Sequence, residues 1–160
     1  MLLAFFIESG DFGISIGISC MKTLVQKLPL SDSTSFVCRT YRTPHFETPW
    51  HRHIEHEIVL IKEGHGTALI GDYTGEFKAG DLFFISSNLP HWFRKATDEL
   101  IGSGLVIQFD RAILGDAFLN LPETKRIKEL LEKDICLQLQ GNLREVLTPL
   151  LQRMEMAAGF

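Results

Sequence analysis

The chain has 160 residues, of which 45% are hydrophobic and 22% are charged. This balance is ordinary for one globular domain that buries its own core, and it argues against a disordered chain. The formal net charge of -4 gives no basic surface that could follow a phosphate backbone, so direct nucleic-acid binding by this chain is not expected.

The first 21 residues are apolar but do not read as a targeting segment. They contain no Lys or Arg before Lys22, and Glu8 and Asp11 interrupt the apolar run. This pattern is wrong for a signal peptide and too short for a membrane span. We therefore expect residues 1–21 to be an extension without an assigned role, with Met21 as a candidate natural start, and we expect no membrane association.

The three cysteines are odd in number and widely spaced, at Cys20, Cys38 and Cys136. The sequence contains no C-x-x-C pair, which would have suggested a zinc or redox site. Reduced, buried thiols in a cytoplasmic protein are the expected state.

Short strands with turn residues between them fill residues 22–110, which we expect to form one β-barrel or sandwich. The expected strands lie at about 36–42, 51–54, 58–62, 67–70, 75–77, 82–85, 92–95 and 105–109. The turns between them are marked by Glu63-Gly64, Gly71-Asp72, Ala79-Gly80 and Asn88-Leu89-Pro90. The pair Phe83 and Phe84 is expected to pack on both faces of its strand.

Two helices are expected in residues 111–160. The first begins at Leu121-Pro122-Glu123 and carries apolar residues at helical spacing as far as Ile135. The second begins at about Asn142 and has a broad apolar stripe, with Pro149 expected to kink or break it. A stripe this wide must pack on the barrel or on a partner chain, so we expect a homodimer formed through the C-terminal helices.

Four residues in the strand region carry the chemistry. His51 and His53 lie two apart, so an extended strand places both imidazoles on one face. Glu57 follows, and His91 comes after a strand-like apolar run. Three imidazoles and a carboxylate suit a divalent transition metal such as Zn, Fe, Ni or Mn. The alternative is a hydrogen-bonded polar cluster without metal.

The other histidines are expected to lie outside this cluster. His56 and His65 are expected at the surface or in a turn, and His45 precedes the first ligand strand without an assigned role. Trp50 and Trp92 each adjoin a candidate ligand, so their rings should face the opposite way.

The spacing of the four residues resembles the two cupin signatures. The first matches His51-x-His53-x3-Glu57-x6-Gly64, and the second matches Gly80-x10-His91. The resemblance implies a mainly β fold, the double-stranded β-helix or cupin jelly-roll barrel, followed by two C-terminal α-helices. The sequence departs from the family pattern with His45, Ser86, Asn88 and Lys95, positions that concern turn geometry more than ligation.

Within the cupins, residues 22–160 resemble the N-terminal sensing domain of AraC-type transcriptional regulators. The sequence segments that carry this resemblance are HRHIEHEIVLIKEGHGTALIGD, GEFKAGDLFFISSNLPHWFR and the helical tail that begins with LPETKRIKELLEK. It implies a small-molecule effector, such as a sugar, bound in the barrel by His51, His53, Glu57 and His91, and a DNA-binding domain that would follow residue 160.

Two other functions stay open from the sequence. One is a small metal-dependent cupin enzyme of dioxygenase or isomerase type, in which the metal acts as a Lewis acid or binds oxygen. The other is a metabolite-binding module with neither catalysis nor a DNA partner. The close match to the sequence of the regulator domain makes the sensing domain the first hypothesis. The fold alone does not identify the function, because one fold hosts many functions.

Overall fold

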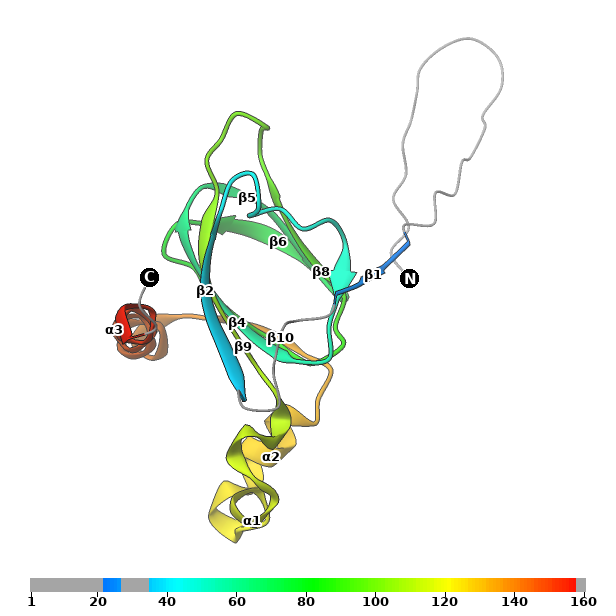
Figure 1. Cartoon of the computed structure of the whole chain (residues 1–160), viewed down its shortest axis with the longest axis vertical. Coiled ribbons are helices and arrows are strands. Elements are labelled where there is room, and N and C mark those ends of the chain that lie inside the picture. The colour runs from blue at the N-terminus through cyan, green and yellow to red at the C-terminus, as the bar shows by residue number, and fades with distance from the viewer. Residues whose placement is uncertain (1–21, 27–34, 158–160) are drawn as a thin grey trace.

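The computed structural model describes residues 22–26 and 35–157, which form two five-stranded sheets that face each other as a barrel (Figure 1). The first sheet has the order β1 (Leu24–Val25), β3 (His51–Arg52), β8 (His91–Lys95), β5 (His65–Ile70) and β6 (Tyr73–Lys78). The second has the order β10 (Cys136–Leu139), β7 (Leu82–Ile85), β4 (His56–Glu63), β9 (Ser103–Phe109) and β2 (Phe36–Arg42). The mainly β barrel expected from the sequence is therefore confirmed.

The core lies between the sheets. Phe77, Phe83 and Phe93 form its aromatic centre, with ring centroids 5.3–5.5 Å apart in edge-to-face contacts between Phe93 and its two neighbours. The next residue along β7, Phe84, faces outward and is buried under the helices. As predicted, the Phe83–Phe84 pair therefore packs on both faces of the second sheet, because successive side chains of a strand alternate.

The predicted turns lie where the sequence placed them. Gly64 joins β4 to β5 with φ +94°, a conformation that glycine adopts without steric cost. Asn88 has φ 59° and occupies the position where the cupin signature has a glycine. Asparagine tolerates this left-handed conformation better than most residues. The departure at residue 88 thus leaves the turn before His91 intact.

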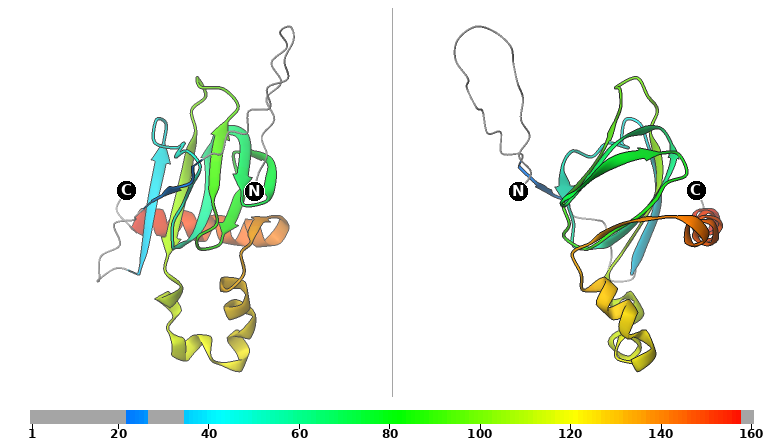
Figure 2. Two further views of the ribbon diagram at one scale, coloured as in Figure 1. Left: turned by 90° about the vertical axis from the view of Figure 1, so that its right-hand side faces the viewer. Right: turned by 180° about the vertical axis from the view of Figure 1, so that it is seen from behind.

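Helices cover the outside of the second sheet and extend beyond it (Figures 1 and 2). A hairpin that we call the α1–α2 lobe projects from one end of the barrel and contains η1 (Arg111–Leu114), α1 (Asp116–Leu119), η2 (Pro122–Thr124) and α2 (Lys125–Leu131). The longest helix, α3 (Gly141–Ala157), lies across the outer face of β2 and β9. Its buried Leu151 packs with Cys38, Leu105 and Ile107 of these strands.

Two expectations about these elements are corrected, and one strand was not expected. The strand expected at 51–54 ends at Arg52, after which the chain crosses to the other sheet. The helix that holds Pro149 is continuous from Gly141 to Ala157, so the proline does not break it, and Leu147 and Leu151 on either side of it pack against the same cluster. The strand β10 was not predicted, and it returns the chain to the barrel edge between α2 and α3 by pairing with β7.

The other expectations concern cysteines and membrane segments. Cys38 and Cys136 are free thiols, buried and half-buried respectively, while Cys20 and the rest of the N-terminal extension lie outside the described residues. Burial raises the pKa of the Cys136 thiol to about 11, so it stays protonated and unreactive at neutral pH. Among the helices in the described ranges, none has the length and apolar character needed to cross a bilayer.

Candidate metal and ligand site

The first sheet brings His51 and His91 together directly. They form the single residue pair that joins β3 to β8, and their ring centroids are 4.2 Å apart. Both are buried. The Nδ1 atom of His51 donates to the carbonyl of Pro49 at 3.2 Å, and that of His91 donates to the carbonyl of Leu89 at 2.8 Å. Each backbone contact fixes the ring orientation of its histidine.

The crossing between the sheets supplies the other two residues. His53 lies just after β3, and Glu57 lies on β4 of the second sheet. The Nδ1 atom of His53 donates to the carbonyl of Glu55 at 3.1 Å, and its Nε2 atom is 2.9 Å from Glu57 Oε2. The other Glu57 oxygen, Oε1, is 3.7 Å from His91 Nε2. The four residues predicted from the sequence therefore converge where the two sheets meet.

The backbone contacts determine the tautomers of the three histidines. A carbonyl oxygen only accepts, so each Nδ1 must carry the proton and a neutral ring keeps its lone pair on Nε2. For His91 this Nε2 is buried and has no hydrogen-bond partner among the described residues. A histidine held in this way, with Nδ1–H on a carbonyl and Nε2 free, is arranged as metal-ligating histidines are.

The donor set fits a divalent transition metal. Ligand atoms of His51, His53 and His91 all lie within 4.8 Å of one another, and each residue is buried. Glu57 adds a carboxylate beside them, so the set contains the nitrogen and oxygen donors that zinc, iron, nickel and manganese accept. The three histidines could hold such an ion, with Glu57 available as a fourth donor.

The charges in the cluster differ from residue to residue. Burial lowers the pKa of His51 to about 4, helped by the neighbouring His91, and burial also lowers the pKa of His91. Burial opposes charge on His53 too, but the hydrogen bond and negative charge of Glu57 outweigh it and raise the His53 pKa. Burial would raise the pKa of Glu57, yet His91 and His53 hold it at about 2. Without metal, a His53 imidazolium therefore pairs with the Glu57 carboxylate.

A cavity of about 50 Å³ opens beside the cluster. It has room for about three or four water molecules, well below the roughly 300–1,000 Å³ of pockets that enclose drug-sized ligands. Its walls combine site residues with apolar and polar residues from several elements: Gln26, Tyr41, His45, Phe46, Thr48, His51, Glu57, Val59, His91, Phe93, Val106 and Gln108.

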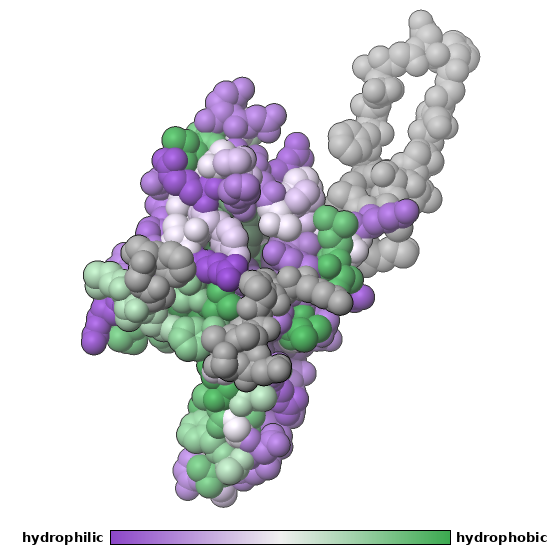
Figure 3. Space-filling view, viewed as in Figure 1, coloured by the Kyte–Doolittle hydropathy of each residue, from purple (hydrophilic) through white to green (hydrophobic). Residues whose placement is uncertain are grey.

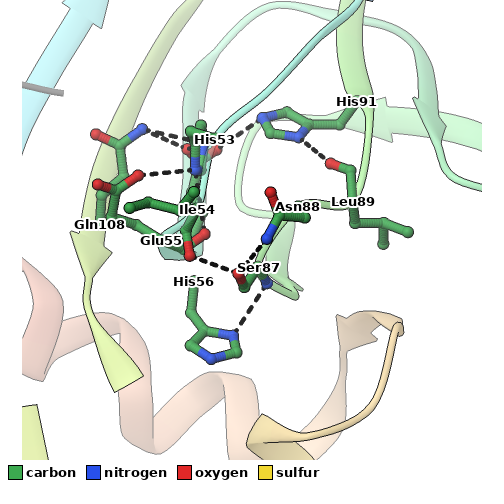
Figure 4. A network of polar contacts seen from close by, with 10 residues as sticks. His53, Ile54, Glu55, His56, Ser87, Asn88, Leu89, His91 and Gln108 are labelled. Carbon is green, nitrogen blue, oxygen red and sulfur yellow. Dashed lines mark hydrogen bonds and ion pairs between the residues drawn. The ribbon is translucent and has the colours of Figure 1, made fainter. Parts of the chain in front are cut away.

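Gln108 is a site residue that was not predicted from the sequence. It lies on β9 directly opposite Glu57 and is buried, and its Nε2 atom donates to Glu57 Oε2 at 2.6 Å. Figure 4 shows Gln108, His53 and His91 directed toward one another. A lone glutamine in a predicted strand carries no spacing signal, so only the register of β4 against β9 reveals it.

The remaining histidines and tryptophans have mixed outcomes. His65 is exposed as expected, but His56 is buried, which contradicts the surface expectation. It points away from the cluster (Figure 4) and packs between Phe84 and Phe109 beneath the α1–α2 lobe. The folding of the lobe onto the barrel therefore buries His56. Trp92 faces outward as predicted, with the Arg94 guanidinium 5.8 Å from its ring centroid.

Residues 41–107 match the sequence model described as the Cupin domain. No curated protein matches the chain in sequence.

Solved structures show distant likenesses. The chain aligns with unsaturated fatty acid-bound ToxT from Vibrio cholerae at 16% identity and a TM-score of 0.49, over 77% of this chain and 48% of that one. A cupin 2 conserved barrel domain protein from Rhodopseudomonas palustris aligns at 24% identity and 0.42, over 65% and 75%. A cupin protein from Bacteroides fragilis aligns at 23% and 0.43, over 59% and 90%. The chain spans about half the length of ToxT, and each likeness is too distant to indicate a function.

The charge pattern predicts how the metal-free histidines titrate. His53 should keep its second proton above pH 6.5, whereas His51 should lose its own near pH 4. Two-dimensional ¹H–¹⁵N NMR of the imidazole nitrogens, in the presence of a chelator, measures both. The substitution Glu57→Gln removes the anion and should bring the His53 pKa down. An unchanged His53 titration in that variant would contradict the assignment, and Glu63→Gln at the exposed pair with Arg42 is the control.

The same titrations give the sign of the pH dependence of stability. Because the Glu57 pKa is lowered, its contribution is present above pH 4.5 and is lost as pH falls toward about 2. Because the His53 pKa is raised, its contribution is present below pH 6.5 and is lost as pH rises through the raised value. Denaturant unfolding of the metal-free protein should show both losses, and Glu57→Gln should show neither.

Proposed function

We propose, starting from the match of residues 41–107 to the sequence model of the Cupin domain, that the chain is the effector-sensing domain of an AraC-type transcriptional regulator. The effector binds at His51, His53, Glu57 and His91 in the barrel. Its signal passes through α3 to a DNA-binding domain outside this chain. This chain has a formal net charge of -4 and is not expected to bind DNA itself. Such a regulator works in the cytoplasm.

The observation that carries this proposal is the alternation of side chains along β4 and β9. Glu57 and Gln108 line the cavity from these strands. The intervening residues Leu60, Leu105 and Ile107 point outward and pack in the same cluster as Leu151 of α3. One strand thickness therefore separates the site from the helix, so a ligand that shifts β4 or β9 changes the surface on which α3 rests.

Polar contacts also join α3 to the barrel. The ammonium group of Lys62 on β4 donates to both carboxylate oxygens of Glu155, at 2.8 and 3.0 Å, and the hydroxyl of Thr40 on β2 donates to the same carboxylate. Hydrogen bonds from Lys62 and Thr40 lower the pKa of Glu155, so it stays charged at neutral pH. Two strands of the second sheet thus hold the helix by the same carboxylate.

The cavity restricts the effector. A volume of about 50 Å³ accommodates a polar molecule or group of only a few heavy atoms. A sugar would require the mouth of the barrel to widen, which would displace strands that α3 contacts. A ligand that prefers the wider arrangement would then shift the equilibrium toward it.

We also propose that the cluster binds one divalent transition metal, held by His51, His53, His91 and Glu57. When bound, this metal supplies a Lewis acid with positions open to a ligand. The same donor set favours the second candidate function, a metal-dependent cupin enzyme of dioxygenase or isomerase type.

Metal binding is tested by elemental analysis of untagged protein. We expect about one transition metal per chain in the wild type and loss of this metal in His51→Ala/His91→Ala, because two of three imidazole donors are gone. The exposed His65→Ala variant should keep its metal. Binding should weaken at low pH, where protons compete for the imidazoles. A wild type that stays free of metal after soaking with zinc, iron and nickel would disprove the metal centre.

The link from site to helix is tested by hydrogen exchange with Zn²⁺ alone as the probe. Zinc should change the exchange rates of α3 amides by about fivefold or more, the lower end of ordinary allosteric coupling. The His51→Ala/His91→Ala protein should show no such change. If zinc slows exchange in the barrel strands but leaves α3 unaffected, the sensing role is refuted while the metal centre stands.

The outer face of α3 supports a homodimer. Leu143, Val146 and Leu150 are about half exposed and recur at a spacing that places them on one side of the helix. The α1–α2 lobe is also apolar along one side (Figure 3), and the exposed apolar residues of the lobe include Phe118 and Leu121. Exposed apolar stripes of this kind mark association surfaces.

Sedimentation at micromolar concentration tests the dimer. The wild type should sediment as twice the 18.1 kDa chain mass. Val146→Glu should give the single-chain species, because it places a charge in the apolar stripe. Gln152→Glu, which adds the same charge on the exposed opposite side of α3, should leave the dimer unchanged. A wild type that sediments only as one chain would disprove this interface.

A further inference from the structure

We infer that Gln108 is a positioning residue that orients the Glu57 carboxylate, so that Oε1 is the oxygen directed toward His91 in the site. This inference deepens the metal centre proposed above and rests on it. Gln108 acts through Glu57 and is not itself counted among the metal donors.

The register of two strands holds Gln108 against Glu57. The two residues are direct partners in the antiparallel ladder of β4 and β9, and both are buried at 4% exposure. Ladder partners on neighbouring strands carry their side chains on the same face, so the two side chains must meet inside the barrel. The contact is therefore built into the sheet and does not depend on a flexible loop.

The chemistry of the contact determines which way the amide faces. A carboxylate oxygen only accepts, so the NH₂ end of Gln108 must face Glu57 Oε2, at 2.6 Å. The same oxygen lies 2.9 Å from His53 Nε2, and the Gln108 nitrogen is 3.4 Å from that ring atom. Two donors thus converge on Oε2.

The consequence concerns the other oxygen. Oε1 lies on the side of His91, 3.7 Å from its Nε2 atom, which has no hydrogen-bond partner among the described residues. The terminal torsion of a glutamate is broad, so an unrestrained carboxylate would rotate away from this orientation. When a metal replaces the proton at His53 Nε2, Gln108 is the donor that still holds Oε2. Oε1 then remains directed at the site.

The test uses Co²⁺ alone as the probe, with affinity measured by competition against a chelator. Gln108→Met keeps the length and apolar bulk of the side chain but loses the donor. It should weaken Co²⁺ binding by about 10- to 100-fold, as loss of an outer-shell partner usually does. It should also change the visible absorption of bound Co²⁺, because the orientation of Glu57 changes. Gln138→Met on β10, which is half-buried and outside this cavity, should leave affinity and spectrum unchanged.

A double-mutant cycle separates positioning from a general loss of structure. In a Glu57→Gln background, Gln108→Met should cost less than about twofold in affinity, because the group it orients is already altered. An equal loss in both backgrounds, or no loss in either, would overturn the inference. Gln108→Leu serves as a second variant, and circular dichroism checks the fold of each protein.

The outcomes also separate this inference from the proposal beneath it. If the wild type binds no Co²⁺, the metal centre fails and the role of Gln108 fails with it. If the wild type and Gln108→Met bind Co²⁺ with the same affinity and spectrum, the metal centre stands and only the role of Gln108 is disproved.

Discussion

The buried ion pair between Glu57 and His53 is the interaction on which the site depends. A carboxylate removed from water is costly unless hydrogen bonds and opposite charge compensate it. Here the compensation comes from both sheets, because His53 follows a strand of the first and Gln108 lies on a strand of the second. The carboxylate therefore ties the two layers of the barrel together at the point where the chain crosses between them.

This arrangement makes the site responsive to what occupies it. A proton at His53 or a metal ion can satisfy the same carboxylate, and the two compete because an imidazole must be deprotonated to bind metal. Since burial lowers the pKa values of His51 and His91, their Nε2 lone pairs are not taken up by protons near neutral pH. The metal-free cluster thus already has the arrangement that the proposed metal centre requires.

The strands β4 and β9, which hold Glu57 and Gln108, also connect the site to the outer surface of the barrel. β4 and β9 are buried on both faces, by the core on the inside and by helices on the outside. This double burial explains why their sequences are nearly continuous apolar runs without a clean alternation. It also means that the floor of the site and the support of α3 are two faces of one sheet. A cavity this small is then compatible with a sensing role only if the sheet can yield, which is the physical basis of the proposed coupling.

The sequence by itself determined most strand positions, most turns and the four central residues, because these depend on local periodicity and on short spacings within about 40 residues. Only the tertiary structure decided which side chains oppose one another. The register of β4 against β9 placed Gln108 on Glu57, and the folding of the α1–α2 lobe buried His56. Likewise β10 becomes a strand through pairing with β7, since its own four residues have no strong pattern. Long-range pairing determines these features, and no local pattern in a single chain encodes it.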